Sequence, residues 1–149
     1  DLGDKVFAER LIEETVTRLG ETIVSRLSGQ APSRVRVTAR EERQVAAVLR
    51  HIEENAAEPL RLEALASVAG VSKYHFLRIF RRVVGMTPYQ FLLSTRMRRA
   101  AWHLSASREN VSSVAYDAGF GDLSTFNARF RSHFGMAPLA YRRRGNLAG

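Results

Sequence analysis

The sequence predicts an all-α protein made of short helices, and three observations support this fold class. Apolar residues recur at steps of three and four along most of the 149 residues, which is the spacing of one face of a helix. Glycine and proline interrupt that pattern at short intervals. Strand-like alternation is confined to Val35-Arg36-Val37, which is too short to form a sheet.

An amphipathic helix is expected at the N-terminal end, within residues 1–29. Its apolar positions follow the helical period until Gly29, and residues 30–40 are then expected to form a linker. A single helix leaves its apolar stripe uncovered, so the stripe could pack on a second copy, on a missing part of the chain or on the following domain. Because the sequence begins with Asp1 rather than Met, we expect a fragment. This helix would then end, or connect to, a missing effector or dimerisation domain.

From residue 41 to residue 149 the pattern indicates a series of short helices with clear start and stop signals. Ser72, Asn110 and Asp122 can each cap a helix, because their side-chain oxygens can accept hydrogen bonds from first-turn N–H groups. Pro88 suits the first position of a long central helix. The expected helices are one ending near Asn55, one over 62–69, one over 72–84, the central one over 88–104, one from 110 to a stop at Gly119, and one over 122–134.

The second half of the chain contains an internal repeat. The pattern F-x-x-x-F-R-x-x-x-G-M-x-P begins at Phe76 and again, fifty residues later, at Phe126. Upstream, a small residue and a glycine recur at an offset of 49, so the second turn is one residue longer. Repetition at a nearly fixed offset indicates two copies of one supersecondary unit. We therefore predict two helix-turn-helix units, at about residues 60–85 and 110–135, on either side of the central helix.

Each copy has the three features that a helix-turn-helix requires. A small residue on the first helix lets the second helix cross closely, and a glycine four residues later can adopt the left-handed backbone of a tight turn. An apolar residue after the glycine can fill the space between the helices. These positions are Ala66, Gly70 and Val71 in the first copy and Ala115, Gly119 and Phe120 in the second.

The positive charge of the chain is concentrated in the same half. Residues 1–70 carry 10 basic and 12 acidic side chains, a net charge of −2, whereas residues 71–149 carry 13 basic and 3 acidic ones, a net charge of +10. Such an excess of Lys and Arg favours a polyanionic partner, because each cation placed on a phosphate releases condensed counterions. Charge alone does not separate DNA from RNA, from another anionic polymer or from an anionic membrane.

Several stretches also match one known family. They are Leu62-Glu63-Ala64-Leu65-Ala66, Ala69-Gly70-Val71-Ser72, Phe76-Leu77-Arg78-Ile79-Phe80, Ala118-Gly119-Phe120-Gly121-Asp122, Phe130-Arg131, Gly135-Met136-Ala137-Pro138 and Tyr141-Arg142. Over about residues 44–144 the chain resembles the DNA-binding domain of AraC/XylS-type transcription regulators. The resemblance implies seven helices, in two helix-turn-helix subdomains joined by a long central helix.

The resemblance also implies how such a protein would read DNA. The second helix of each unit, residues 72–82 and residues 122–134, is expected to enter the major groove in successive turns on one face of the duplex. A central helix of roughly 17 residues is about 25 Å long, which suits reading helices one 34 Å turn apart.

On the first reading helix the resemblance assigns base contacts to Tyr74, Leu77 and Arg78. Arg78 is the strongest of these, since a guanidinium can bind guanine O6 and N7 with two parallel hydrogen bonds. Phosphate contacts carry no sequence information, and in this half of the domain we expect them from Lys73, His75, Arg81, Arg82 and, on the central helix, Arg96.

The second reading helix is expected to read fewer bases. Its matching positions are Leu123, Ser124, Asn127 and Ala128. The family often has Gln where this chain has Leu123 and Arg where it has Ala128, so two bidentate donors are missing. Asn127 suits adenine, and phosphate contacts are expected from Thr125 and Arg131.

The sequence disfavours an enzyme, and we expect no metal or cofactor. Its 4 histidines are far apart without metal-ligand spacing, and it has no cysteine, no glycine-rich phosphate loop and no nucleophile elbow. Double-stranded DNA is the expected partner, with RNA polymerase as the expected protein partner. A homodimer could form through a missing N-terminal domain or through the 5–28 helix.

Two other functions remain as alternatives, a basic helical protein-interaction module and an RNA-binding module. RNA readers usually expose aromatic side chains to stack bases, whereas most Phe residues here occupy inward helical positions. The apolar runs are too short to span a bilayer, so no membrane contact is expected, and the expected location is the cytoplasm.

Overall fold

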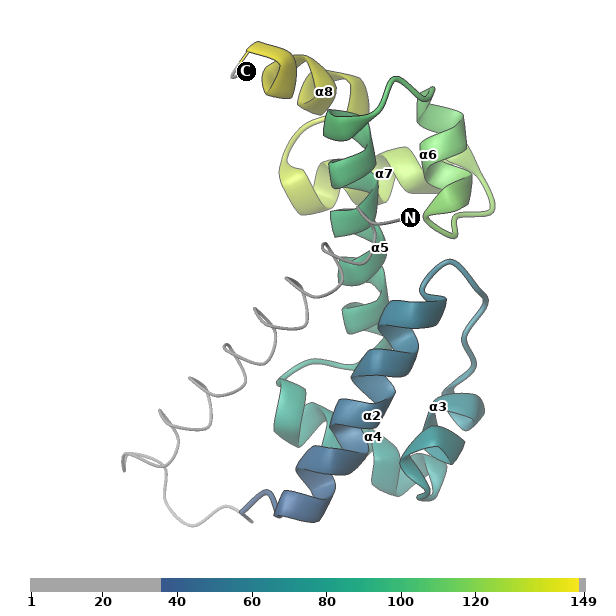
Figure 1. Ribbon diagram of the computed structural model, residues 1–149, viewed down its shortest axis with the longest axis vertical. Coiled ribbons are helices and arrows are strands. Elements are labelled where there is room, and N and C mark those ends of the chain that lie inside the picture. Colours follow the sequence, from purple (N-terminus) through teal and green to yellow (C-terminus); the bar gives the residue numbers. More distant parts are fainter. Residues whose placement is uncertain (1–35, 148–149) are drawn as a thin grey trace. The chain divides into compact units, whose positions relative to one another are not determined.

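The computed structural model describes residues 36–147, which form seven helices and, within that range, no strand (Figure 1). The prediction of an all-α fold is therefore confirmed. The helix expected within residues 1–29 and most of the linker expected at 30–40 lie outside the described residues. The helices are α2 (Ala39–Asn55), α3 (Leu62–Ala69), α4 (Lys73–Val84), α5 (Pro88–Ala106), α6 (Val111–Asp117), α7 (Leu123–Phe134) and α8 (Pro138–Leu147).

The chain divides into two compact units, each of which contains one copy of the repeat. The first unit comprises the described residues up to Glu53 together with Leu62–Pro88, and thus most of α2 with α3 and α4. The second unit comprises Glu54–Arg61 and the residues from Tyr89 onward, and thus α5 to α8. The two predicted helix-turn-helix units are therefore present, and the central helix α5 belongs to the second of them.

The core of the first unit follows the apolar spacing of its helices. Val45, Val48 and Ile52 on α2 are fully buried, as are Phe76 and Phe80 on α4. The centroids of the two phenyl rings are 5.6 Å apart. Because these aromatic residues are spaced i, i+4, they lie on one face of α4, and the opposite face is left for solvent or a ligand.

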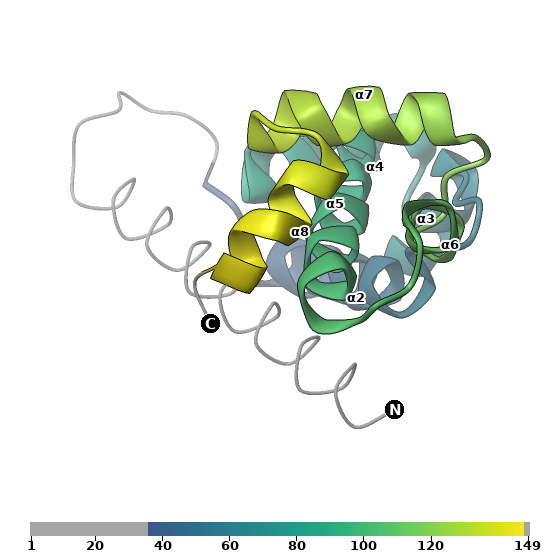
Figure 2. The same cartoon turned by 90° about the horizontal axis from the view of Figure 1, so that it is seen from above.

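The core of the second unit is built around α5. Met97 on α5, Val114 on α6 and Phe126 and Phe130 on α7 are fully buried in one cluster. Tyr141 on α8 places its ring edge-on to Phe130, with 5.4 Å between the ring centroids. Helix α7 runs crosswise to α5 (Figures 1 and 2), so its inward aromatic face packs on the core and its outer face remains exposed.

Both helix-turn-helix turns have the same backbone geometry. Gly70 and Gly119 have φ angles of 73° and 100°, in the left-handed region that favours glycine. The next N–H group donates back to the carbonyl five residues earlier, from Val71 to Ala66 at 3.2 Å and from Phe120 to Ala115 at 3.0 Å. This pairing satisfies carbonyls at the end of the first helix and turns the chain sharply into the second.

The predicted caps of the reading helices are also confirmed. The Ser72 hydroxyl accepts from the His75 N–H at 3.3 Å, and the Asp122 carboxylate accepts from the Thr125 N–H at 2.7 Å. Both reading helices end at a left-handed glycine, Gly85 or Gly135. Short-range capping therefore fixes where α4 and α7 begin and end.

Two helix ends differ from the sequence expectation, and one helix is additional to those that periodicity predicts. Helix α5 extends to Ala106 rather than Leu104, and α6 ends at Asp117, so that Gly119 lies in the turn rather than at the helix end. Helix α8 was missing from the helices expected from periodicity, because its sequence PLAYRRRGNL has few apolar residues. Pro138 was the available signal, since it repeats Pro88 at the start of α5.

We predict that Gly119→Ala destabilises the protein more than Gly70→Ala. A left-handed backbone costs a residue with a Cβ about 1–2 kcal/mol at either position. A Cβ at Gly119 would also lie 2.9 Å from Arg96 Nε and 3.1 Å from the Ala57 carbonyl oxygen, whereas a Cβ at Gly70 meets nothing within 4 Å. Urea denaturation should give an additional loss of about 1 kcal/mol for Gly119→Ala.

Gly121→Ala is the control, because Gly121 has no left-handed backbone and its Cβ would meet nothing within 4 Å. Its stability should change by less than about 0.5 kcal/mol. Equal losses for Gly70→Ala and Gly119→Ala would contradict the close packing at the second turn.

Candidate nucleic-acid interface

The outer face of α4 carries the predicted base-reading side chains of the first unit. Tyr74 is 75% exposed and Arg78 is also exposed, while Leu77 is half-buried. Arg81, one of the predicted phosphate contacts, is exposed, and His75 is half-buried. The structure therefore places an aromatic ring, an apolar side chain and a guanidinium on one short helix, where they could meet base edges and a phosphate.

Lys73 at the start of α4 forms an ion pair across the turn. Its Nζ lies 3.3 Å from Oε1 of Glu63 on α3, and both side chains are largely exposed. An exposed pair of this kind contributes at most about 1 kcal/mol and is screened by salt. Lys73 can therefore exchange this carboxylate for a phosphate at little cost.

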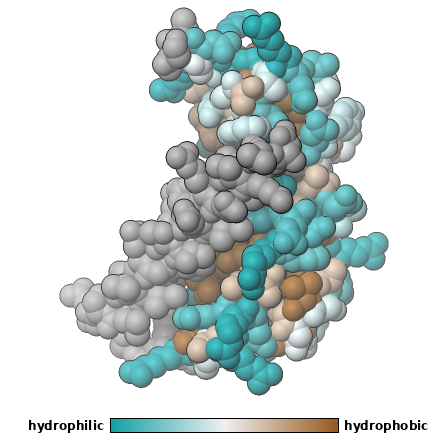
Figure 3. All heavy atoms as spheres, in the orientation of Figure 1, coloured by the Kyte–Doolittle hydropathy of each residue, from teal (hydrophilic) through white to brown (hydrophobic). Residues whose placement is uncertain are grey.

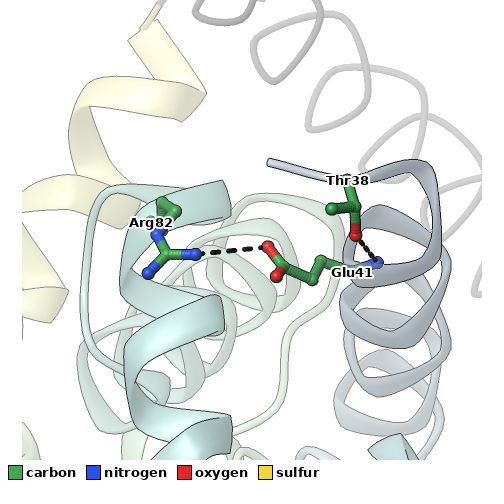
Figure 4. A network of polar contacts seen from close by, with 3 residues as sticks. All are labelled: Thr38, Glu41 and Arg82. Carbon is green, nitrogen blue, oxygen red and sulfur yellow. Dashed lines mark hydrogen bonds and ion pairs between the residues drawn. The ribbon is translucent and has the colours of Figure 1, made fainter. Parts of the chain in front are cut away.

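Arg82 at the end of α4 has a partner within its own unit (Figure 4). Its Nη1 lies 3.4 Å from Oε2 of Glu41 on α2, and the two side chains are 30% and 15% exposed. Glu41 is in turn held by its backbone N–H, which donates to the Thr38 hydroxyl at 3.1 Å. This contact joins α4 to the start of α2. The phosphate contact that the sequence predicts for Arg82 would compete with this ion pair.

The outer face of α7 carries fewer donors than that of α4. Ser124, Asn127 and Ala128 are exposed, and Leu123 is 36% exposed. Arg131 is exposed as well. The expected base-reading positions of α7 thus face solvent, but only Ser124 and Asn127 offer polar side-chain atoms.

The Thr125 hydroxyl is used within the helix cap. Its Oγ1 donates to Oδ2 of Asp122 at 2.8 Å, and the Thr125 N–H donates to Oδ1 at 2.7 Å. These two hydrogen bonds hold the pKa of Asp122 below its ordinary value. The bond from the Thr125 backbone has the larger effect, and the bond from its hydroxyl has the smaller one. Because its hydroxyl proton is already donated, Thr125 is less available to a phosphate than the sequence suggested.

Arg96 on α5 supports the loop before the first helix-turn-helix. Its Nε donates to the Ala56 carbonyl at 2.7 Å and its Nη2 donates to the Glu58 carbonyl at 2.9 Å. Burial lowers the pKa of this guanidinium, an effect that the neighbouring Tyr89 partly offsets. Arg96 therefore holds this loop in the structure, with two of its donor atoms, Nε and Nη2, bound to carbonyls. The phosphate contact predicted for Arg96 would have to share or replace these hydrogen bonds.

Arg142 on α8 holds the loop between α5 and α6 in the same way. Nothing in the sequence signals this role, apart from the match of Tyr141-Arg142 to the end of the family pattern. The Nε of Arg142 donates to the Leu104 carbonyl at 2.9 Å and its Nη2 to the Glu109 carbonyl at 2.5 Å. In each case one guanidinium joins the end of a helix to the loop that follows it. Surface arginines and loop-holding arginines look alike in a sequence, because the carbonyls they bind are far away along the chain.

Burial also affects one histidine near the end of α7. It lowers the pKa of His133, and the positive charge of Arg98 lowers it further. Both effects favour the neutral form of the His133 imidazole.

The part of the sequence that contains both reading helices, from residue 71 onward, carries little negative charge. From residue 71 onward the only acidic residues are Glu109, Asp117 and Asp122, and Asp122 is used as the cap of α7. Hydrophilic side chains cover α8 on the face shown in Figure 3, and this helix carries three consecutive arginines at 142–144. The electrostatics of residues 71–147 thus favour an anionic partner.

The described part of the chain lacks two other features. Among residues 36–147 no three His, Asp or Glu side chains are grouped so that they could hold a metal ion. Within the same range no helix has the length and apolarity needed to cross a bilayer.

Comparison with known proteins identifies the class to which this fold and surface belong. Residues 65–144, more than half of the chain, match the helix-turn-helix domain family. The chain belongs to this family, as an AraC-type DNA-binding domain of a transcription regulator. Proteins of this class regulate transcription and are not enzymes.

Two curated relatives illustrate the match. The multiple antibiotic resistance protein MarA of Escherichia coli is 33% identical over 95 residues, which are 64% of this chain and 75% of MarA. An uncharacterized HTH-type transcriptional regulator of Haemophilus influenzae is 33% identical over 86 residues, which are 58% of this chain but only 29% of that protein. The chain thus spans less than a third of the length of some relatives that it matches.

Solved structures support the same assignment. An AraC-type transcriptional regulator from Chromobacterium violaceum superposes with a TM-score of 0.69 at 25% identity, over 75% of this chain and all of the other. The DNA-binding domain of AdpA, in complex with a target DNA, superposes with a TM-score of 0.61 at 32% identity, over 72% of this chain and 93% of the other.

The cap of α7 predicts a pH dependence. Because the pKa of Asp122 is lowered in the folded protein, its contribution to stability is complete above the ordinary value of 3.8 and is lost as the pH falls through the lowered pKa. Asp122→Asn keeps a capping acceptor but does not titrate. The difference in Tm between the wild type and Asp122→Asn should be constant above about pH 5. Below about pH 4, the Tm of the wild type should fall more than the Tm of the variant. A difference that stays constant down to pH 2 would contradict this role of the Asp122 carboxylate.

Proposed function

We propose that this domain binds duplex DNA sequence-specifically by placing α4 and α7 in successive major-groove segments on one face of the duplex. The observation that carries the proposal is the repeated unit itself. In both units a helix of twelve residues is capped at its N-terminus, ends at a left-handed glycine and buries an i, i+4 aromatic pair on one side only. A rigid helix with one free face is what direct readout in the major groove requires.

In the first unit we assign base reading to Tyr74, Leu77 and Arg78. Arg78 supplies a bidentate donor for guanine, while Tyr74 offers a ring for a thymine methyl group. Leu77 adds apolar contact between them. All three are exposed or half-buried on the outer face of α4.

In the second unit we assign base reading to Asn127 and Ser124, with apolar contact from Leu123 and Ala128. Asn127 can pair with adenine N6 and N7. Because α7 offers no guanidinium at these positions, the second half of a binding site should tolerate base changes better than the first half.

Phosphate contacts are assigned to Lys73, His75, Arg81 and Arg131. Each lies at the surface or half-buried on a reading helix, so each could orient its helix without reading sequence. Arg82, Arg96 and Thr125 remain proposed phosphate contacts as well, and a phosphate would there replace or share the intramolecular partners described above.

The remaining partners are proposed from the class of protein. RNA polymerase is the proposed protein partner, because a regulator of transcription acts on initiation, and the cytoplasm is the proposed location. We also propose a homodimer, for which residues 5–28 are the candidate interface within this chain, and two copies would then occupy a longer operator.

The test is fluorescence anisotropy of the chain on random duplex DNA and on a preferred duplex selected from a random library, titrated with salt. The logarithm of the affinity should fall linearly with the logarithm of salt concentration, because counterions are released. Arg78→Ala should cost about 1–3 kcal/mol on the preferred duplex and much less on random DNA. Arg81→Ala should weaken both duplexes by similar factors and reduce the salt slope by about 1.

Arg108→Ala is the matched control, since Arg108 is an exposed arginine between α5 and α6. It should leave the preference between the two duplexes unchanged. Absence of duplex binding at low salt would refute the proposed function, and equal losses for Arg78→Ala on both duplexes would refute the base-reading role of Arg78.

A further inference from the structure

The second unit contains a pocket beside α7 whose lining includes none of the base-reading positions assigned to that helix. It has a volume of about 200 Å³ and is formed by α5, by the turn before α7 and by the first half of α7. This volume is below the range of about 300–1,000 Å³ typical of pockets for drug-sized ligands, so only a smaller molecule would fit. Its lining residues are Tyr89, Leu92, Leu93, Arg96, Gly119, Phe120, Gly121, Thr125 and Arg129.

One side of the pocket is apolar. Leu92 and Phe120 are buried at 6% and 8% exposure, and Leu93 is partly buried against the core cluster of the unit. Tyr89, by contrast, is 61% exposed and forms part of the pocket edge. A ligand seated here would therefore place an apolar body against leucine and phenylalanine side chains.

The other side is cationic and lacks a matching carboxylate. Arg96 is half-buried, and its hydrogen bonds in the described part of the chain go to two neutral backbone carbonyls. Arg129 is exposed, and neither arginine forms an ion pair with a carboxylate among residues 36–147. A guanidinium removed from water without a counter-ion gains most from an anion that enters the same pocket.

We propose that this pocket binds a small organic carboxylate, with its apolar body against Leu92, Leu93 and Phe120 and its carboxylate between Arg96 and Arg129. A small acid fits better than a DNA phosphate, because a phosphodiester would leave the apolar side of the pocket empty. The ligand would touch α7 through Arg129, on a different face from Ser124 and Asn127. Its binding does not depend on the proposed function, since the pocket is complete within the second unit.

The experiment is a titration of the full chain with cyclohexanecarboxylate, without DNA, followed by isothermal calorimetry and by ¹H–¹⁵N correlation spectra. Cyclohexanecarboxamide is the neutral control of the same shape. The carboxylate should bind with a Kd on the order of 1 mM or tighter, as expected for a ligand of this size, and it should shift the amide signals of Phe120, Gly121 and Arg129. The carboxamide should bind at least about fivefold more weakly.

Two charge-matched variants separate the pocket from general attraction by a basic protein. Arg129→Gln should weaken cyclohexanecarboxylate binding about three- to fivefold, whereas Arg108→Gln, which removes one charge outside the pocket, should leave it unchanged. Leu93→Trp, which fills the apolar side, should abolish binding while the spectrum stays folded.

The proposal is overturned if the acid and the amide bind equally, or if Arg129→Gln and Arg108→Gln have the same effect. It is also overturned if the acid does not bind. If Arg129→Gln then lowers affinity for every duplex, the pocket serves a DNA phosphate instead. Failure of duplex binding alone would refute the proposed function and leave this pocket proposal standing.

Discussion

Both reading helices depend on one backbone constraint, the left-handed glycine between the two helices of each unit. With Gly70 or Gly119 in that conformation, the N–H group of the next residue donates to a carbonyl of the first helix. The cap of the second helix follows two residues after Gly70 and three residues after Gly119. The direction of α4 and α7 is therefore set by local hydrogen bonds rather than by distant packing. Packing then fixes their rotation, because the i, i+4 aromatic pairs must face inward. The free face that results on each helix is the basis of the proposed DNA contact.

The arginines of the basic half divide into two groups by the atoms they contact. Arg82 pairs with a carboxylate, and Arg96 and Arg142 hold backbone carbonyls at the ends of helices. Arg78, Arg81, Arg129 and Arg131 are instead exposed on the reading helices. Net charge therefore overstates the surface available to a polyanion. It still indicates the correct partner class, because the exposed arginines on the two reading helices remain available to an anionic partner.

The sequence predicts those parts of the fold that short-range interactions determine. The caps at Ser72, Asn110 and Asp122 and the turns at Gly70 and Gly119 involve groups at most five residues apart, so they could be identified from local patterns. The partners of Arg82 and Arg96 are 41 and 40 residues away along the chain, and no local pattern distinguishes these side chains from solvated ones. The pocket beside α7 was missed for the same reason, since its lining comes from three separate segments. The base-reading set comes from the family resemblance, and the structure shows only that its members lie on the outer faces of α4 and α7.

The central claim is that two reading helices occupy two major-groove segments, and dimethyl sulfate protection on a preferred duplex tests it most directly. The reagent methylates guanine N7, an atom in the major groove. We predict two protected clusters centred about one helical turn, or 10–10.5 base pairs, apart. Asn127→Ala should weaken protection only in the cluster read by α7. A single protected cluster, or protection confined to the minor groove at adenine N3, would contradict the account.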